Sequence, residues 1–414
     1  MNPTHIGLPR LAWRSLRSRR LSALLVIIAI ALSVVLLLAV ERIRSQARTS
    51  FANTIAGTDL IVGARTGNLN LLLYSVFRLG DATPAMSWNS YQQLAALPQV
   101  AWRIPIALGD SHRGYAVVGT SSAYFSHYRH GRQQPLQLAA GRAFGKPLEA
   151  VLGAEVARAL DYRIGSPLIL AHGRRGAQFT HHDQLPFVVV GILAATGTPV
   201  DRSVHVPLEG LEAVHRRGAT PTNLEHYDLT PRNLSAVLVG LHQRTATFAV
   251  QRHIQAMASE PLSAILPGLT LQQLWDQMAV AEQLLQLVSA MVAVVGLFVL
   301  LVALLMSLNE RRREMALLRA LGAAPHQLLA LVVGEALLLA AGGCALGVAS
   351  HSPTCSRATP VLESRLGLNI AIWPPTRYEA LLLLAILAAA LLAALFPAWR
   401  AYRRAVADGL ILRS

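Results

Sequence analysis

Four long apolar stretches, separated by polar segments of very different length, dominate the pattern of the chain. Residues 21–40 contain no charge, and a helix of 20 residues spans roughly the 30 Å hydrocarbon core of a bilayer. Similar stretches follow at 283–308, 328–349 and 380–399, and Glu335 is the one charged residue within them. The pattern predicts four transmembrane helices.

A cleaved signal peptide is the alternative for the first stretch, because arginines precede it. Its apolar core is too long for a signal peptide, and Glu41, Arg42 and Arg44 follow it with no A-x-A cleavage site. We therefore expect a retained helix.

The segment between the first two apolar stretches, 41–282, alternates short apolar runs with amphipathic ones, which favours a mixed α/β domain. The strongest strand candidate is 187–193 (FVVVGIL), and 271–287 has helical periodicity with no breaker before the second apolar stretch. We read 271–287 as a stalk continuous with that helix. The other predicted elements are strands at 59–64, 114–120, 150–152 and 235–241 and helices at 88–97, 153–161 and 245–257.

Arginines flank the apolar stretches unevenly. They cluster before the first, between the second and third, and after the fourth, whereas 350–379 holds only three in a longer segment. Since positively charged flanks stay in the cytoplasm, the pattern places 1–20, 309–327 and 400–414 inside and both 41–282 and 350–379 outside. Apolar residues alternate with arginines within 1–20, which indicates an amphipathic segment on the inner leaflet or a plain charged anchor.

Composition agrees with a membrane protein that carries a folded outer domain. Of 414 residues, 53% are hydrophobic and 14% charged, against about 25% charged residues in soluble proteins. The net charge of +15 lies largely beside the apolar stretches, so we expect membrane lipid rather than nucleic acid as its partner. The two cysteines form no CxxC pair, which argues against a zinc knuckle or a disulfide framework.

The sequence lacks the usual catalytic motifs. It has no G-x-x-x-x-G-K-[ST] phosphate loop, no G-x-S-x-G elbow and no HExxH pair. We therefore expect a non-catalytic chain with no directly bound cofactor.

Two sets of residues remain as candidate sites. His181, His182 and Asp183, with His172 nearby, are either a weak zinc site or a solvated polar loop. Glu335, within the third apolar stretch, is either an interfacial hydrogen-bonding group or a proton or ion site.

The segment 309–329, NERRREMALLRALGAAPHQLL, resembles the coupling segment of the FtsX-like and MacB-like ABC transporter permeases. Runs at 149–170, 186–193 and 396–402 also resemble motifs of this family, in the expected order. The resemblance implies a four-helix membrane protein with a MacB-like periplasmic core domain, without a fused ATPase. It assigns ATPase coupling to Glu310, Arg311, Arg313, Glu314, Arg319 and Gly322.

The resemblance also implies partners and a location. These are a cytoplasmic ABC ATPase that carries ATP and Mg²⁺, a second copy or a related permease, a possible periplasmic partner, and the bacterial inner membrane. The polar run 350–360 departs from the family pattern and is either an extended loop or a frameshift. Substrate export or extraction, regulation of an outer enzyme such as a cell-wall hydrolase, and zinc-linked transport remain open as functions.

Overall fold

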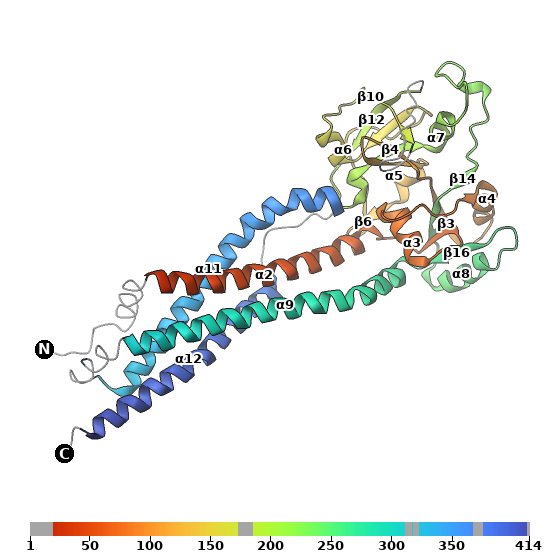
Figure 1. Cartoon of the computed structure of the whole chain (residues 1–414). Coiled ribbons are helices and arrows are strands. Elements are labelled where there is room, and N and C mark those ends of the chain that lie inside the picture. Colours follow the sequence, from red (N-terminus) through yellow and green to blue (C-terminus); the bar gives the residue numbers. More distant parts are fainter. Residues whose placement is uncertain (1–19, 173–184, 311–316, 318–322, 367–375, 412–414) are drawn as a thin grey trace. The chain divides into compact units, whose positions relative to one another are not determined.

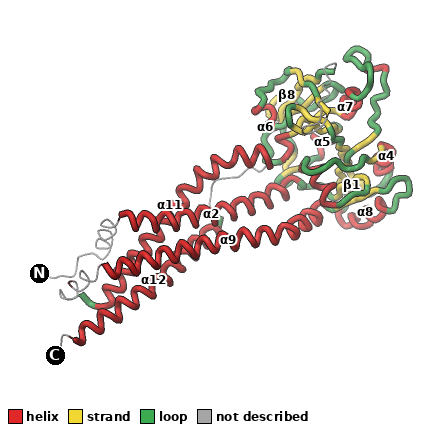
Figure 2. The backbone as a smooth tube through the Cα atoms, viewed as in Figure 1, coloured by secondary structure: helices red, strands yellow, loops and turns green. Residues whose placement is uncertain are grey.

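The structure, a computed structural model, describes all residues except 1–19, 173–184, 311–316, 318–322, 367–375 and 412–414 (Figure 1). The chain forms two compact units. The helical unit comprises Met1–Gln46, Val280–Val361 and Ile370–Ser414, and the outer unit comprises Ala47–Ala279 and Leu362–Asn369. Strands occur only in the outer unit among the described residues (Figure 2).

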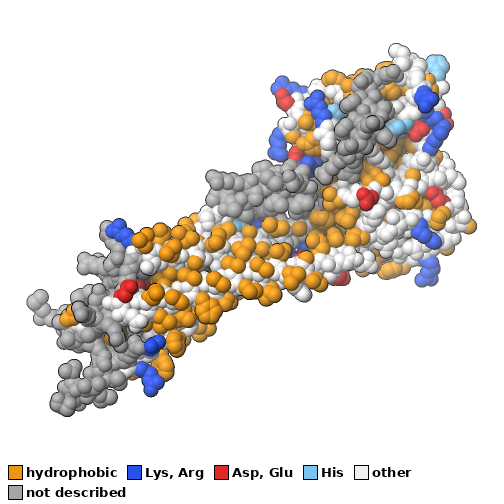
Figure 3. All heavy atoms as spheres, in the orientation of Figure 1, with side chains coloured by type: hydrophobic (Ala, Val, Ile, Leu, Met, Phe, Trp, Pro, Cys, Tyr) orange, Lys and Arg blue, Asp and Glu red, His pale blue; other side chains and the backbone are white. Residues whose placement is uncertain are grey.

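Four long helices account for the helical unit: α2 (Arg20–Thr54), α9 (Pro267–Glu310), α11 (Pro325–Leu366) and α12 (Arg377–Ile411). Each contains a segment long and apolar enough to cross a membrane, which confirms the four predicted spans. Large apolar side chains such as Leu25, Phe298 and Leu392 are 60–67% exposed, and such side chains cover the visible face of these helices (Figure 3). A continuous apolar surface of this kind fits contact with lipid.

The predicted loop beginning at residue 350 is wrong as far as Leu366, because α11 continues to that residue. Polarity excludes a segment from the hydrocarbon core but does not end a helix, and the polar run from Ser350 to Pro360 lies within α11 although it contains Pro353 and Pro360.

Small residues allow the helices of the bundle to approach closely. A Cβ added to Gly343 of α11 would lie 2.6 Å from Ile30 of α2, and one added to Gly347 would lie 2.7 Å from Val34. The Ser33 hydroxyl donates a hydrogen bond of 3.1 Å to the carbonyl of Val292 on α9. Glycines that bring backbones together are a common device of membrane helix packing, and here they serve packing within one chain.

The outer unit contains two larger sheets. The first is antiparallel, with the strand order β16-β1-β15-β3. The second has the order β10-β12-β9-β13-β5-β4-β11, and β8 also pairs with β12. Its β12–β9 and β13–β5 pairs are parallel and the rest antiparallel, so the mixed α/β prediction is confirmed.

The strand bounds are β1 (Leu60–Ala64), β2 (Met86–Ser87), β3 (Val100–Ile106), β4 (Asp110–His112), β5 (Tyr115–Thr120), β6 (Arg129–His130), β7 (Gln134–Pro135), β8 (Leu138–Gly141), β9 (Glu149–Leu152), β10 (Pro167–Leu168), β11 (Ala171–His172), β12 (Phe187–Leu193), β13 (Ser203–Pro207), β14 (Asn233–Leu234), β15 (Ala236–Leu241) and β16 (Leu262–Ile265). The two small ladders pair β2 with β14 and β6 with β7.

Short helices connect and cover these sheets. They are α3 (Asn68–Leu72), the π-helix η1 (Leu73–Phe77), α4 (Trp88–Ala95), α5 (Ala123–His127), α6 (Ala154–Ala159), η2 (Pro199–Arg202), α7 (Leu208–Val214), η3 (Leu224–His226), η4 (Arg244–Ala246) and α8 (Thr247–Gln255). The predicted helices at 88–97, 153–161 and 245–257 correspond to α4, α6 and α8.

Candidate coupling site

The last turns of α2 and the first turns of α9 lie in the outer unit and contact each other through aromatic rings. Phe51 of α2 stacks on Phe77 of η1 at a centroid distance of 4.2 Å, and it forms a T-shaped pair with Trp275 of α9 at a centroid distance of 5.5 Å. The guanidinium of Arg48 lies 5.5 Å from the centre of the Trp275 ring. We call these four residues the aromatic junction. Their stacked and edge-on geometries are those that add to the energy of burial.

Hydrogen bonds hold the end of α2 as well. The Tyr128 hydroxyl donates to the carbonyl of Thr54 at 2.8 Å, and the backbone N–H of Gly131 donates to the carbonyl of Asn53 at 2.9 Å. The final carbonyls of a helix have no hydrogen-bond donor within that helix, and here residues of the outer unit donate to two of them. These hydrogen bonds fix the end of α2 to the rest of the outer unit.

Beside Phe77 a buried arginine lies among the aromatic rings of the hydrophobic core. Arg78 is 5% exposed, adopts a left-handed backbone with φ of 56°, and donates to the carbonyl of Val76 and to the Tyr124 hydroxyl. Burial lowers the pKa of His205 to about 3, helped by the nearby charge of Arg78, and burial raises the pKa values of Tyr124 and Tyr128. Burial disfavours the charged form of each group, so Arg78 stands among neutral rings.

A buried ion pair joins α2 and α12 at one end of the helical bundle. The Nε of Arg42 on α2 lies 2.9 Å from a carboxylate oxygen of Glu379 on α12, and the two side chains are 5% and 4% exposed. The other oxygen of Glu379 accepts from the Thr376 N–H at 2.7 Å, and the Thr376 hydroxyl accepts from the Glu379 N–H at 3.2 Å. This reciprocal pattern is a capping box. Glu379 therefore starts α12 and joins it to α2.

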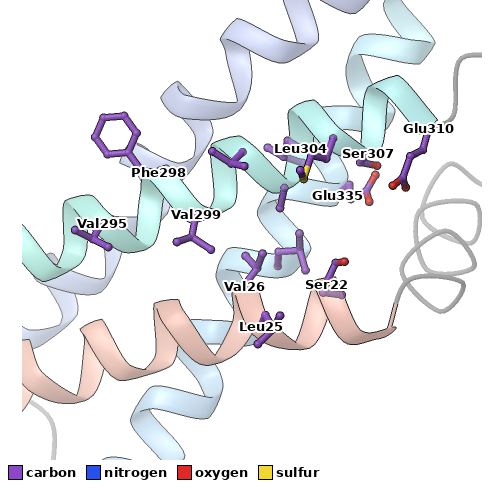
Figure 4. Close-up of a pocket in the computed structure, with 15 residues that line it drawn as sticks. Ser22, Leu25, Val26, Val295, Phe298, Val299, Leu304, Ser307, Glu310 and Glu335 are labelled. Carbon is purple, nitrogen blue, oxygen red and sulfur yellow. The ribbon is translucent and has the colours of Figure 1, made fainter.

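The opposite end of the bundle contains a cavity of about 430 Å³ between α2, α9 and α11. Two of the predicted site residues, Glu310 and Glu335, line it together with Ser22 and Ser307. These four lie at one end, and apolar side chains including Val295 and Phe298 line the rest (Figure 4). Glu335 is 6% exposed, and a carboxylate this far inside a bundle is expected to be functional or hydrogen-bonded.

Several predicted site residues lie outside the described part of the chain. These are Arg311, Arg313, Glu314, Arg319 and Gly322 of the coupling segment and the trio His181, His182 and Asp183. Among the described residues no group of three or more His, Cys, Asp and Glu side chains converges to hold a metal ion.

Sequence reasoning missed the Arg42–Glu379 pair and the aromatic junction. One local signal was available for the pair, since Thr376-x-x-Glu379 directly precedes an apolar run and has the spacing of a capping box.

Two family models match the chain and together cover most of it. The MacB-like periplasmic core domain matches residues 21–257, and the FtsX-like permease C-terminal domain matches residues 287–406. The chain belongs to the FtsX-like and MacB-like family of ABC transporter permeases. The family resemblance predicted from the sequence is thereby confirmed.

Solved structures similar to this permease are outer regions of related transporters. The periplasmic region of MacB from Actinobacillus actinomycetemcomitans is 10% identical, with 54% of this chain and 97% of that chain covered and a TM-score of 0.34. The extracellular domain of the noncanonic ABC-type transporter YknZ from Gram-positive bacteria is 14% identical, with 50% and 99% covered and a TM-score of 0.30. No curated protein matches the sequence.

Proposed function

We propose that this permease couples ATP hydrolysis by a separate cytoplasmic ATPase to movement of its outer unit, for export or extraction of a substrate at the outer face. The observation that carries the proposal is that α2 and α9 each run without interruption from a predicted span into the outer unit. Helix α9 has 44 residues without interruption, a length of about 66 Å, and includes both a predicted span and Trp275 of the aromatic junction. A displacement of such a helix at one end moves the other end as well.

The family supplies the other components of the proposal. Two such permease subunits would each bind an ATPase through the segment between α9 and α11. ATP and Mg²⁺ would belong to the ATPase, and this chain would bind no cofactor directly. Glu310, the last described residue of α9 before the coupling segment, lines the cavity with Glu335 and would then connect that segment to the bundle.

The proposal requires both termini and the coupling segment to face the cytoplasm of a bacterial cell, with the outer unit on the other side of the inner membrane. We expect topology reporters fused at Ala177 to report the outside, and those fused at Ala316 or at the C-terminus to report the inside, because the arginine-rich flanks stay inside. An inside signal at Ala177 would contradict the orientation and with it the proposed direction of coupling.

The coupling residues are tested by replacing Glu314 or Arg319 with alanine. We expect ATPase binding or ATP-dependent activity of the reconstituted complex to fall about tenfold, a loss of roughly 1.4 kcal/mol, while membrane insertion is unchanged. Co-purification with the ATPase and hydrolysis rates in nanodiscs measure the two effects. Arg400→Ala is the matched control, since it removes an exposed arginine outside the segment. Normal assembly and full activity in both variants would refute the assignment.

A further inference from the structure

The cavity of the helical bundle has the two-part character of an amphiphile. Its volume of about 430 Å³ is within the range of about 300–1,000 Å³ that is typical of small-molecule sites. Ser22, Ser307, Glu310 and Glu335 lie at one end (Figure 4). Every other residue that lines the cavity is apolar, so the site favours a ligand with a polar head and a long apolar tail.

One face of α9 sets the length of the apolar part. Val295, Val299 and Met306 line the cavity and are four and seven residues apart, a spacing that places them on the same side of a helix. At 1.5 Å per residue, the stripe from Val295 to Met306 is about 16 Å long. Half of the hydrocarbon core of a bilayer is about 15 Å thick. The apolar part therefore has the length of an acyl chain in one leaflet.

The polar end lies where two of the apolar stretches begin or end. Ser22 is the second residue of the stretch 21–40, and Glu310 follows the stretch 283–308 by two residues. Residues at the ends of membrane spans lie at the level of the lipid head groups. The polar and apolar parts of the cavity thus match the head group and the acyl chain of a lipid in depth as well as in length.

The rim of the cavity is part of the apolar surface of the bundle. Leu25 of α2 and Phe298 of α9 both line the cavity, and they are 65% and 60% exposed. Side chains this exposed on a predicted span are positioned to contact lipid. A lipid of the surrounding bilayer can therefore enter from the side, between α2 and α9, without leaving the membrane.

The charge of the polar end selects the head group. Glu310 and Glu335 are carboxylates, and Glu335 is only 6% exposed, so its charge acts through a medium of low dielectric constant. A primary ammonium group has three N–H donors and forms charge-assisted hydrogen bonds with carboxylates. The hydroxyls of Ser22 and Ser307 can donate to the phosphate of the same lipid. An anionic head group would place like charges beside each other.

We propose that this cavity binds one phospholipid with a primary amine head group, such as phosphatidylethanolamine. One acyl chain lies along the stripe from Val295 to Met306, and the ammonium group lies at Glu310 and Glu335. The lipid is a bound component of the permease, and the site does not depend on the proposed transport function.

The test is native mass spectrometry of the full-length permease in detergent micelles, with phosphatidylethanolamine, phosphatidylcholine and phosphatidylglycerol of identical acyl chains. Phosphatidylcholine keeps the positive charge but has no N–H donor, and phosphatidylglycerol is anionic and has no amine. We expect one phosphatidylethanolamine per chain, and at least about tenfold weaker binding of the other two lipids, because each loses hydrogen bonds to charged groups.

Two variants separate the head-group contact from the acyl-chain contact. Glu335→Gln should remove the preference for phosphatidylethanolamine, and Glu310→Gln tests the same contact if thermal melts show that the first variant does not fold. Val299→Trp fills the apolar part and should weaken binding of all three lipids. The matched control is Leu392→Trp on α12, because this leucine is 67% exposed and is not among the residues that line the cavity.

Three results would overturn the proposal. Equal binding of the three lipids would mean an adventitious lipid only, and a preference for phosphatidylglycerol would mean that basic groups select the head group. Unchanged binding of phosphatidylethanolamine in folded Val299→Trp would place the lipid outside this cavity.

Discussion

Replacing Glu379 with alanine is expected to lower the unfolding free energy of the helical unit by about 3–5 kcal/mol, the usual cost of leaving one partner of a buried ion pair without the other. The guanidinium of Arg42, which is 5% exposed beside Glu379, would lose that carboxylate. The Thr376 N–H would also lose the carboxylate that now accepts from it at 2.7 Å. A missing cap of this kind costs about 1 kcal/mol.

Denaturant unfolding of the protein in detergent micelles measures the effect, and two variants separate the roles of Glu379. Glu379→Gln keeps an oxygen for the Thr376 N–H and removes the charge, so it should retain the cap and lose the ion pair. Arg42→Met combined with Glu379→Met should recover most of the loss, because replacing a buried pair by apolar groups of similar volume is often nearly neutral. A double variant as unstable as the sum of the single ones would show that the pair does not act as a unit.

The helices and strands that were predicted correctly are those whose sequence signal lies within one short stretch of the chain. The first span follows from 20 consecutive uncharged residues and β12 from a run of apolar and β-branched residues after Pro186, and both need only local information.

The contacts that were missed join residues far apart in the chain. Arg42 and Glu379 are separated by nearly the whole sequence, and each alone reads as an ordinary charge at the end of a span. Phe51, Phe77 and Trp275 are likewise unremarkable aromatic residues until the fold brings α2, η1 and α9 together.

The polar continuation of α11 was missed for a different reason. The residues from Ser350 to Pro360 were interpreted as a loop because they are polar. Hydrophobicity marks the part of a helix that can lie in lipid and does not mark where the helix ends, so a polar run can continue an apolar helix, as it does in α11.

Removing the Phe51 side chain is expected to uncouple the outer unit from ATP hydrolysis. The ring stacks on Phe77 and contacts Trp275, so Phe51→Ala breaks the link between α2, α9 and η1 while leaving the coupling segment intact. We expect a loss of about 2 kcal/mol in the unfolding free energy of the outer unit, less than the 3–5 kcal/mol for a fully buried phenylalanine, because Phe51 is only partly buried.

Spin labels at Arg217 and Arg400, one in each unit, report the motion through their ATP-dependent change in distance in the complex with the ATPase. If the junction transmits the movement of α2 and α9, Phe51→Ala should reduce that change at least twofold while the rate of ATP hydrolysis persists. Phe248→Ala is the matched control, because this phenylalanine on α8 is 63% exposed and outside the junction. An unchanged distance response in Phe51→Ala would mean that the displacement reaches the outer unit without the aromatic junction.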